Sequence, residues 1–113
     1  PTVLSNVPKT ANCVHDEIFS PVAAIQTFDN LDAVIESAND TEYGLVAYVF
    51  TENMKLGMSV CERLDYGMVG LNRGLVSDPA APFGGTKQSG LGREGGHEGM
   101  LEFTETQYIS ASW

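Results

Sequence analysis

Glu17 and Phe19 are the two residues whose types and spacing best suit them to bind a small molecule. They lie two positions apart, so in an extended segment both side chains point to the same side. A carboxylate accepts two hydrogen bonds from a ribose diol, and an aromatic ring covers a flat heterocycle. Composition alone favours a simpler interpretation, in which a solvated glutamate lies beside a core phenylalanine.

A glycine pattern, Gly90-Leu91-Gly92-Arg93-Glu94-Gly95, matches the GxGxxG turn of dinucleotide-binding folds. That function requires a strand before the turn, a helix after it and an acidic residue on a second strand. Here a Gly-rich loop precedes the pattern, and only 18 residues follow Gly95. We therefore predict a tight structural loop.

Cysteine and histidine predict neither a metal site nor a nucleophile. Cys13 and His15 share a segment that we expect to be extended, but two ligands are insufficient for zinc. Cys61 and His97 lie in unrelated contexts, and Cys61 falls on an apolar helix stripe, where a small core residue is typical. Two cysteines are too few for a disulfide scaffold, which favours a reducing compartment, cytoplasmic or equally mitochondrial.

Five alternating elements would position these residues. Apolar runs predict strands over 22–28, 45–50 and 68–71, and 3.6-residue periodicity predicts helices over 31–39 and about 53–64. Asp29-Asn30 offers a cap for the first helix, and Thr51 one for the second. Strand, helix, strand, helix, strand indicates parallel crossovers and the α/β class.

The remainder of the chain has a different character. Residues 72–96 form a Gly- and Pro-rich loop of a length that is usually functional. A short helix over 94–102 and a weakly alternating strand over 104–113 follow. We assign residues 1–103 to one domain portion and 104–113 to a terminal strand or tail, whose open edge invites pairing with another chain or with a missing part of this one.

Composition restricts the class of protein. Hydrophobic residues at 42% and charged residues at 19% are typical of a globular domain. Six Lys and Arg against 15 Asp and Glu give a net charge of −9, which argues against a nucleic-acid partner. No apolar run reaches the roughly 18 residues of a membrane span. We see no signal peptide, and a first residue other than Met indicates that Pro1 is not the natural start.

Four stretches, in this order and spacing, carry a resemblance that covers essentially the whole chain. They are Glu17-Ile18-Phe19-Ser20-Pro21, Asn39-Asp40-Thr41-Glu42-Tyr43-Gly44-Leu45, Tyr66-Gly67-Met68-Val69-Gly70-Leu71-Asn72 and Pro82-Phe83-Gly84-Gly85-Thr86-Lys87-Gln88-Ser89-Gly90-Leu91-Gly92-Arg93-Glu94. Together they resemble the carboxy-terminal part of the aldehyde dehydrogenase superfamily. Any one motif is modest support, whereas four in register are strong.

The resemblance implies a role for each candidate residue. Glu17 would hold the nicotinamide ribose and Phe19 would pack beside the nicotinamide of NAD or NADP. Phe83 would line the substrate tunnel. Ser77, in the form Gly-Leu-Val-Ser, resembles succinate-semialdehyde dehydrogenases, where a hydroxyl suits the far carboxylate of the substrate. The usual Gly after Phe19 is Ser20 here, which restricts the turn before Pro21.

Arg93 and Glu105 would brace the loop and the subunit contact, and residues 104–113 would join an oligomerisation sheet. Two solvated surface charges are the simpler alternative for the pair.

The implied reaction is oxidation of an aldehyde, with a cysteine thiolate as nucleophile and a glutamate-activated water. Neither Cys13 nor Cys61 matches the nucleophile, so no catalytic residue is assigned, and the chain alone should be inactive. Two alternatives stay open: a free-standing assembly or binding module derived from such an enzyme, and a degenerate remnant.

Overall fold

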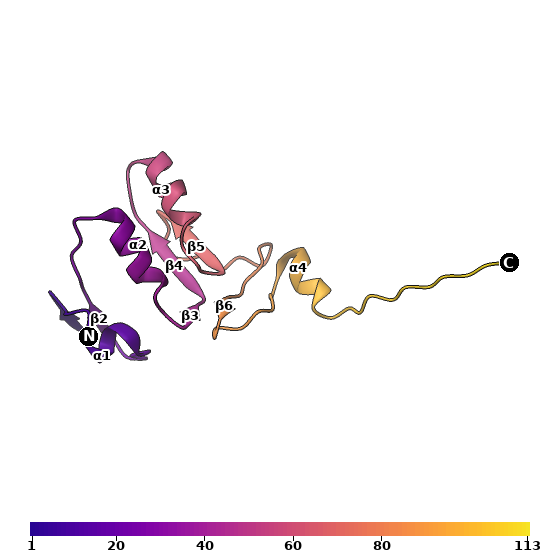
Figure 1. The fold of residues 1–113 in the computed structure, drawn as a ribbon, viewed down its shortest axis with the longest axis horizontal. Coiled ribbons are helices and arrows are strands. Elements are labelled where there is room, and N and C mark those ends of the chain that lie inside the picture. Colours follow the sequence, from indigo (N-terminus) through magenta and orange to yellow (C-terminus); the bar gives the residue numbers. More distant parts are fainter. The chain divides into compact units, whose positions relative to one another are not determined.

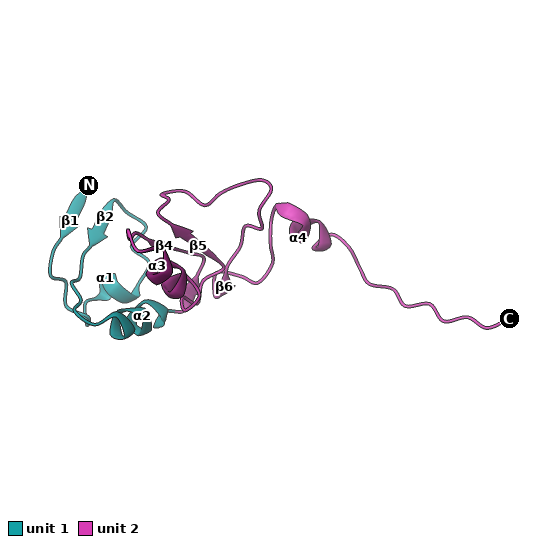
Figure 2. Ribbon diagram, turned by 90° about the horizontal axis from the view of Figure 1, so that it is seen from above, with its two compact units in different colours: residues 1–41 teal, residues 42–113 magenta.

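A computed structural model describes residues 1–113 in full. The chain divides into two compact units, Pro1–Thr41 and Glu42–Trp113 (Figure 2). Each unit is built around one pair of parallel strands.

Unit 1 contains two strands and two helices: β1 (Thr2–Leu4), α1 (Asn12–His15), β2 (Val22–Ala24) and α2 (Leu31–Asn39). β1 and β2 pair in parallel, with Thr2 opposite Val22. The predicted cap of α2 is confirmed, because the Asn30 side chain accepts a hydrogen bond from Ala33 N at 2.9 Å. The buried residue of α2, Ile35, lies on its predicted apolar stripe.

Unit 2 is a βαβ unit followed by a loop and a terminal helix (Figure 1). Its elements are β3 (Tyr43–Gly44), β4 (Val46–Val49), α3 (Met54–Cys61), β5 (Met68–Leu71), β6 (Thr86–Lys87) and α4 (Gly96–Leu101). β4 and β5 run parallel, with α3 as the crossover between them. β3 and β6 pair antiparallel.

The α/β class and the parallel strands are confirmed, but the pairing differs from one three-stranded core. β2 and β4 lie in different two-stranded sheets. β2 pairs instead with β1, whose three residues are too few to show a period of two. The short helix α1 also occupies the Cys13–His15 segment that we expected to be extended, and Thr51 does not cap α3. Asn53 does, accepting from Leu56 N at 3.0 Å.

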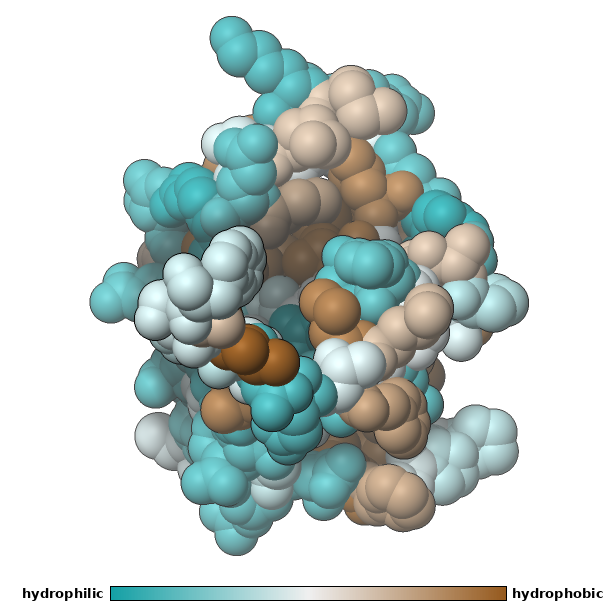
Figure 3. Space-filling view, turned by 90° about the vertical axis from the view of Figure 1, so that its right-hand side faces the viewer, coloured by the Kyte–Doolittle hydropathy of each residue, from teal (hydrophilic) through white to brown (hydrophobic).

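Little apolar surface is buried within the chain. Ile35, 5% exposed, is the buried hydrophobic side chain, and large apolar residues such as Phe28, Phe50 and Leu75 are exposed. Brown apolar side chains accordingly lie on the visible surface among teal polar ones (Figure 3). Burying one such side chain contributes about 1.5–3 kcal/mol, whereas ordering a residue's backbone costs about 1–2 kcal/mol. A chain that buries so little apolar surface is expected to be only marginally stable.

The terminal segment 104–113 carries no strand in this structure, and every residue in it is exposed. It leaves α4 as an extended chain (Figure 1). Its pairing in a larger sheet stays a prediction. No helix has the length and apolar character needed to cross a membrane.

Candidate functional site

Three of the four motifs meet in unit 2, at the β3–β6 pair. Gly44 of β3 lies opposite Thr86 of β6. The Gly44 N–H donates to Ser89 Oγ at 3.0 Å, and Thr86 Oγ1 donates to Asp65 O at 3.3 Å. The Lys87 ammonium pairs with the Asp65 carboxylate at 3.1 Å. These bonds join segments that lie 21 to 45 residues apart in the sequence.

Glycine is required where these segments touch. A Cβ on Gly67 would lie 2.0 Å from Gly84 O and 2.6 Å from Gly85 Cα, both backbone atoms that cannot rotate aside. A Cβ on Gly84 would lie 2.3 Å from Gly92 O. The three motifs are therefore packed backbone against backbone, and we name residues 44, 67, 84 and 85 the glycine contact.

Arg93 fixes the loop that follows the glycine contact. Its Nη1 donates to Gly85 O at 2.8 Å, Leu91 O at 3.1 Å and Gly92 O at 2.9 Å. Backbone hydrogen bonds join the two ends of this loop. Phe83 and Glu94 exchange two N–H···O bonds of 2.7 Å. The GxGxxG stretch is thus a closed loop around a guanidinium. The two-residue strand β6 precedes it and α4 follows it, and the Phe83–Glu94 bridge joins its end to the residue before the glycines.

Glu102 is a residue that the sequence pattern did not single out. Its carboxylate accepts the backbone N–H of Arg93 at 3.2 Å, from the end of α4. A cavity of about 370 Å³ opens among the loop, Leu45 and Glu102. Its lining residues are Leu45, Phe83, Gly84, Gly85, Ser89, Gly90, Gly92, Arg93, Glu94 and Glu102. Phe83 therefore lies half-buried at a hollow surface, with its backbone fixed on both sides.

Asn72 fixes the other end of the loop, where β5 stops. Its side chain accepts from Thr51 N and donates to Thr51 O, both at 2.8 Å. Asn72 has φ of 53°, so the chain turns away from the strand there. Ser77 follows on the exposed part of the loop, and Asp78 Oδ1 accepts from Ala80 N at 2.9 Å to close the next turn.

Glu17 and Phe19 lie in unit 1, on the irregular segment between α1 and β2. Both side chains are exposed, Phe19 to 93%, and no hydrogen bond within the chain occupies the Glu17 carboxylate. Phe19 has φ of 48°, a conformation that a phenylalanine rarely adopts without surrounding support. The segment therefore presents a carboxylate and a ring that nothing in unit 1 covers.

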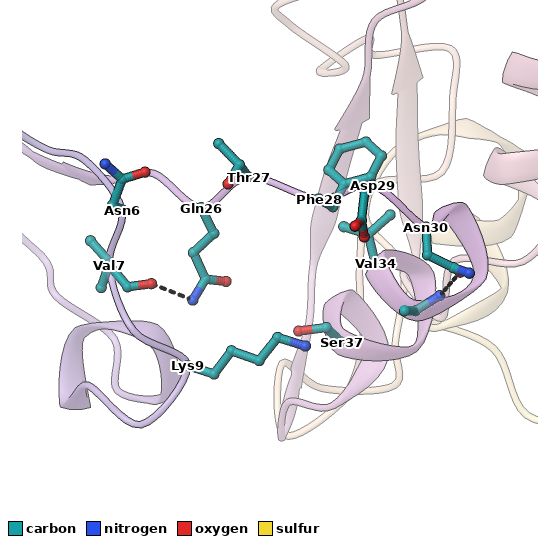
Figure 4. Close-up of a pocket in the computed structure, with 11 residues that line it drawn as sticks. Asn6, Val7, Lys9, Gln26, Thr27, Phe28, Asp29, Asn30, Val34 and Ser37 are labelled. Atoms are coloured by element: carbon teal, nitrogen blue, oxygen red, sulfur yellow. Dashed lines mark hydrogen bonds between the residues drawn. The ribbon is translucent and has the colours of Figure 1, made fainter.

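A second cavity, of about 350 Å³, lies within unit 1 between the loop after β1 and helix α2 (Figure 4). Among its lining residues, Gln26 Nε2 donates to Val7 O at 3.0 Å, and Lys9 extends toward Ser37 (Figure 4). It holds none of the predicted site residues.

The remaining candidates stand apart. Glu105 lies in the exposed terminal segment, and His15 Nε2 is bonded to Lys9 O at 2.7 Å. Cys13 and Cys61 are free. No three His, Cys, Asp or Glu side chains gather in a way that would hold a metal ion.

Comparison with known proteins shows which family has a similar sequence and fold. The aldehyde dehydrogenase family model matches residues 1–109. A succinate-semialdehyde dehydrogenase of Paenarthrobacter nicotinovorans is 52% identical over 109 residues, 96% of this chain and 24% of that protein. A glutarate-semialdehyde dehydrogenase of Pseudomonas putida is 46% identical over 112 residues, 99% of this chain and 23% of that protein.

The solved aldehyde dehydrogenase of Brucella melitensis biovar abortus 2308 superposes with a TM-score of 0.90 at 50% identity. The match covers 95% of this chain and 22% of that one. The chain thus spans between a fifth and a quarter of the length of these relatives. With nearly its whole length matched in both sequence and structure, the chain belongs to the aldehyde dehydrogenase family.

Proposed function

We propose that this chain is part of an NAD(P)-dependent aldehyde dehydrogenase that oxidises succinate semialdehyde to succinate. The observation that carries the proposal is the 52% identity to a succinate-semialdehyde dehydrogenase over almost the full chain. Ser77 also supports the proposal. It places a hydroxyl on the loop that follows β5, at a position where an enzyme for apolar aldehydes would favour an aromatic ring.

Glu17 and Phe19 would hold the cofactor. The chemistry of the pair fits a nicotinamide riboside, because the carboxylate is a free acceptor for a diol and the ring is a free apolar face. When bound, NAD or NADP supplies the hydride acceptor. Similar solved enzymes are NAD+ complexes, whereas a Sinorhizobium fredii relative is named for NADP+, so both cofactors fit the proposal.

Ser77 and Phe83 would contact the substrate. Phe83 would cover the aldehyde chain from the braced side of the loop, and the Ser77 hydroxyl would donate to the far carboxylate. Arg93 would act on Phe83 indirectly, by holding the carbonyl groups of the loop that carries it.

The rest of the enzyme would be supplied from outside this chain. We assign no catalytic residue here, and we expect no activity from residues 1–113 alone. Residues 1–103 would complete the catalytic domain, and residues 104–113 with Glu105 would join an oligomerisation sheet between subunits. A reducing compartment, cytoplasmic or mitochondrial, fits two free thiols, and relatives from rice and Arabidopsis thaliana are named mitochondrial.

One observation favours a second function. Residues 105–113 leave their backbone unpaired and carry exposed Tyr108, Ile109 and Trp113, so a chain of this length would bind a partner strand. A free-standing assembly module derived from the enzyme would use this segment.

Substitution of Ser77 tests the proposed substrate. In the intact enzyme, Ser77→Phe should raise KM for succinate semialdehyde by about tenfold or more, because a charge-assisted hydrogen bond is replaced by an apolar ring. Butanal has the same carbon chain without the carboxylate and serves as the matched substrate. An equal loss for both aldehydes would remove the case for succinate semialdehyde.

A further inference from the structure

Arg73 lies at the start of the same loop as Ser77, and its guanidinium makes no hydrogen bond or ion pair within the chain. The loop leaves β5 at its carboxyl end, beside the carboxyl end of the parallel strand β4 (Figure 1). Ligands of α/β sheets bind outside the carboxyl ends of their strands. A charged side chain at this position is therefore placed where substrates of such folds bind.

The backbone before Arg73 is fixed. Asn72 clasps the backbone of Thr51 through two hydrogen bonds of 2.8 Å, and its left-handed conformation sets the direction in which the chain leaves the strand. The backbone that leads into Arg73 is therefore held by hydrogen bonds, whereas the Arg73 side chain has no hydrogen-bond partner within the chain. Little backbone entropy remains to be lost when its guanidinium binds.

The guanidinium is available. Arg73 is exposed and makes no hydrogen bond or ion pair within the chain, whereas Arg93 is bonded to loop carbonyls and Lys87 to Asp65. The nearest acidic residue in the loop sequence, Asp78, has one carboxylate oxygen bonded in its own turn. No partner on the loop therefore neutralises Arg73.

The chain around it is acidic, with a net charge of −9. A guanidinium at the carboxyl end of β5 would attract an anionic substrate against that net charge. A guanidinium binds a carboxylate through two parallel N–H···O bonds, with a geometry that a hydroxyl alone does not provide.

We propose that Arg73 is a specificity-determining residue that binds the carboxylate at the far end of the aldehyde substrate, with Ser77 as its second donor. The inference rests on the proposed function and extends it to a substrate class, aldehydes that end in a carboxylate. Relatives of this chain are named for succinate, glutarate and aspartate semialdehydes, which share that group and differ in what separates it from the aldehyde.

Steady-state kinetics of the intact enzyme test the proposal, with succinate semialdehyde and butanal as paired substrates and both NAD and NADP supplied. Arg73→Met should lower kcat/KM for succinate semialdehyde about 10- to 100-fold, mainly through KM, and leave butanal unchanged. Arg73→Lys keeps the charge without the fork and should retain part of the preference. Lys55→Met, which removes an exposed charge from α3, is the matched control and should change neither.

Each other result has one meaning. Equal losses for both aldehydes would show that Arg73 shapes the loop, and unchanged kinetics would show that it stays in solvent; either overturns the proposal. A wild-type enzyme that does not prefer succinate semialdehyde to butanal would instead overturn the proposed function, a failure visible before any variant is made. Unaltered melting temperature of Arg73→Met is expected, since its side chain makes no bond in the fold.

Discussion

The segment around Glu17 and the loop around Phe83 are held in opposite ways. Phe83 lies between two backbone hydrogen bonds, and its loop is closed by Arg93 and by glycines in backbone contact. Glu17 and Phe19 lie on an irregular segment with both side chains in solvent. The first region carries its own support within the chain, and the second needs a surface that the chain does not contain.

Substitutions in these two regions should therefore affect different properties of the enzyme. Changes in the braced loop should alter folding first and activity as a consequence. Changes at the exposed pair should alter activity without altering folding, because no bond of the fold is lost there.

Gly67→Ala should have the largest effect. Its added carbon would lie 2.0 Å from Gly84 O, so the two motifs must separate, and we expect a loss of about 3 kcal/mol or more in the free energy of unfolding. Urea unfolding of the intact enzyme measures it. Gly74→Ala is the matched control, because nothing lies within 4 Å of the added carbon and its stability should stay near wild type. Equal midpoints for the two variants would mean that the glycine contact does not limit stability.

Arg93→Met should come next. Three carbonyl oxygens lose a charged donor, which we expect to cost about 2 kcal/mol. Because Phe83 is attached to the same loop, KM should rise for butanal and succinate semialdehyde alike. Thermal unfolding and paired kinetics provide the two readouts. A rise in KM for succinate semialdehyde alone would mean that Arg93 contacts the substrate, and the loop could then no longer be described as a purely structural support.

Glu17→Gln should have the smallest effect on stability and a clear effect on rate. Losing the charged acceptor weakens the hold on the ribose, so hydride transfer should slow by about tenfold while the melting temperature stays unchanged. Single-turnover absorbance of the reduced cofactor measures the step. Glu36→Gln, on the exposed face of α2, is a control in the same unit. Unaltered hydride transfer, or a lowered melting temperature, would contradict the assignment.

Sequence patterns predicted the elements that are long enough to show a period. Helix 31–39 and strand 68–71 have the predicted bounds, and strand 45–50 differs by a residue at each end. The predicted strand 22–28 instead ends at Ala24, and the predicted helix 53–64 spans Met54–Cys61. The elements missed are β1, β3, β6 and α1, each of two to four residues. Their pairing is decided by partners that lie far along the chain, and no local pattern contains that information.

In the candidate site too, some features could be predicted from the sequence and others could not. The types and spacing of Glu17 and Phe19 indicated what that pair could bind, whereas Ser77 and Phe83 were assigned from the resemblance alone. The structure adds what the types do not encode: that Asn53 rather than Thr51 caps α3, and that Glu102 reaches Arg93 N. Caps compete over a few residues, and Thr51 instead lies in the Asn72 clasp.

The clasp of Asn72 on Thr51 has an evolutionary consequence. It fixes one end of the loop and the Phe83–Glu94 bridge fixes the other, while residues 73–77 make no hydrogen bond between them. Val76 is half-buried and packs close to Gly70, but the other positions of that window are exposed, so we expect substitutions there to carry little penalty in folding. If Arg73 and Ser77 contact the substrate as we propose, single substitutions at these exposed positions would give enzymes on this scaffold a route to new aldehydes.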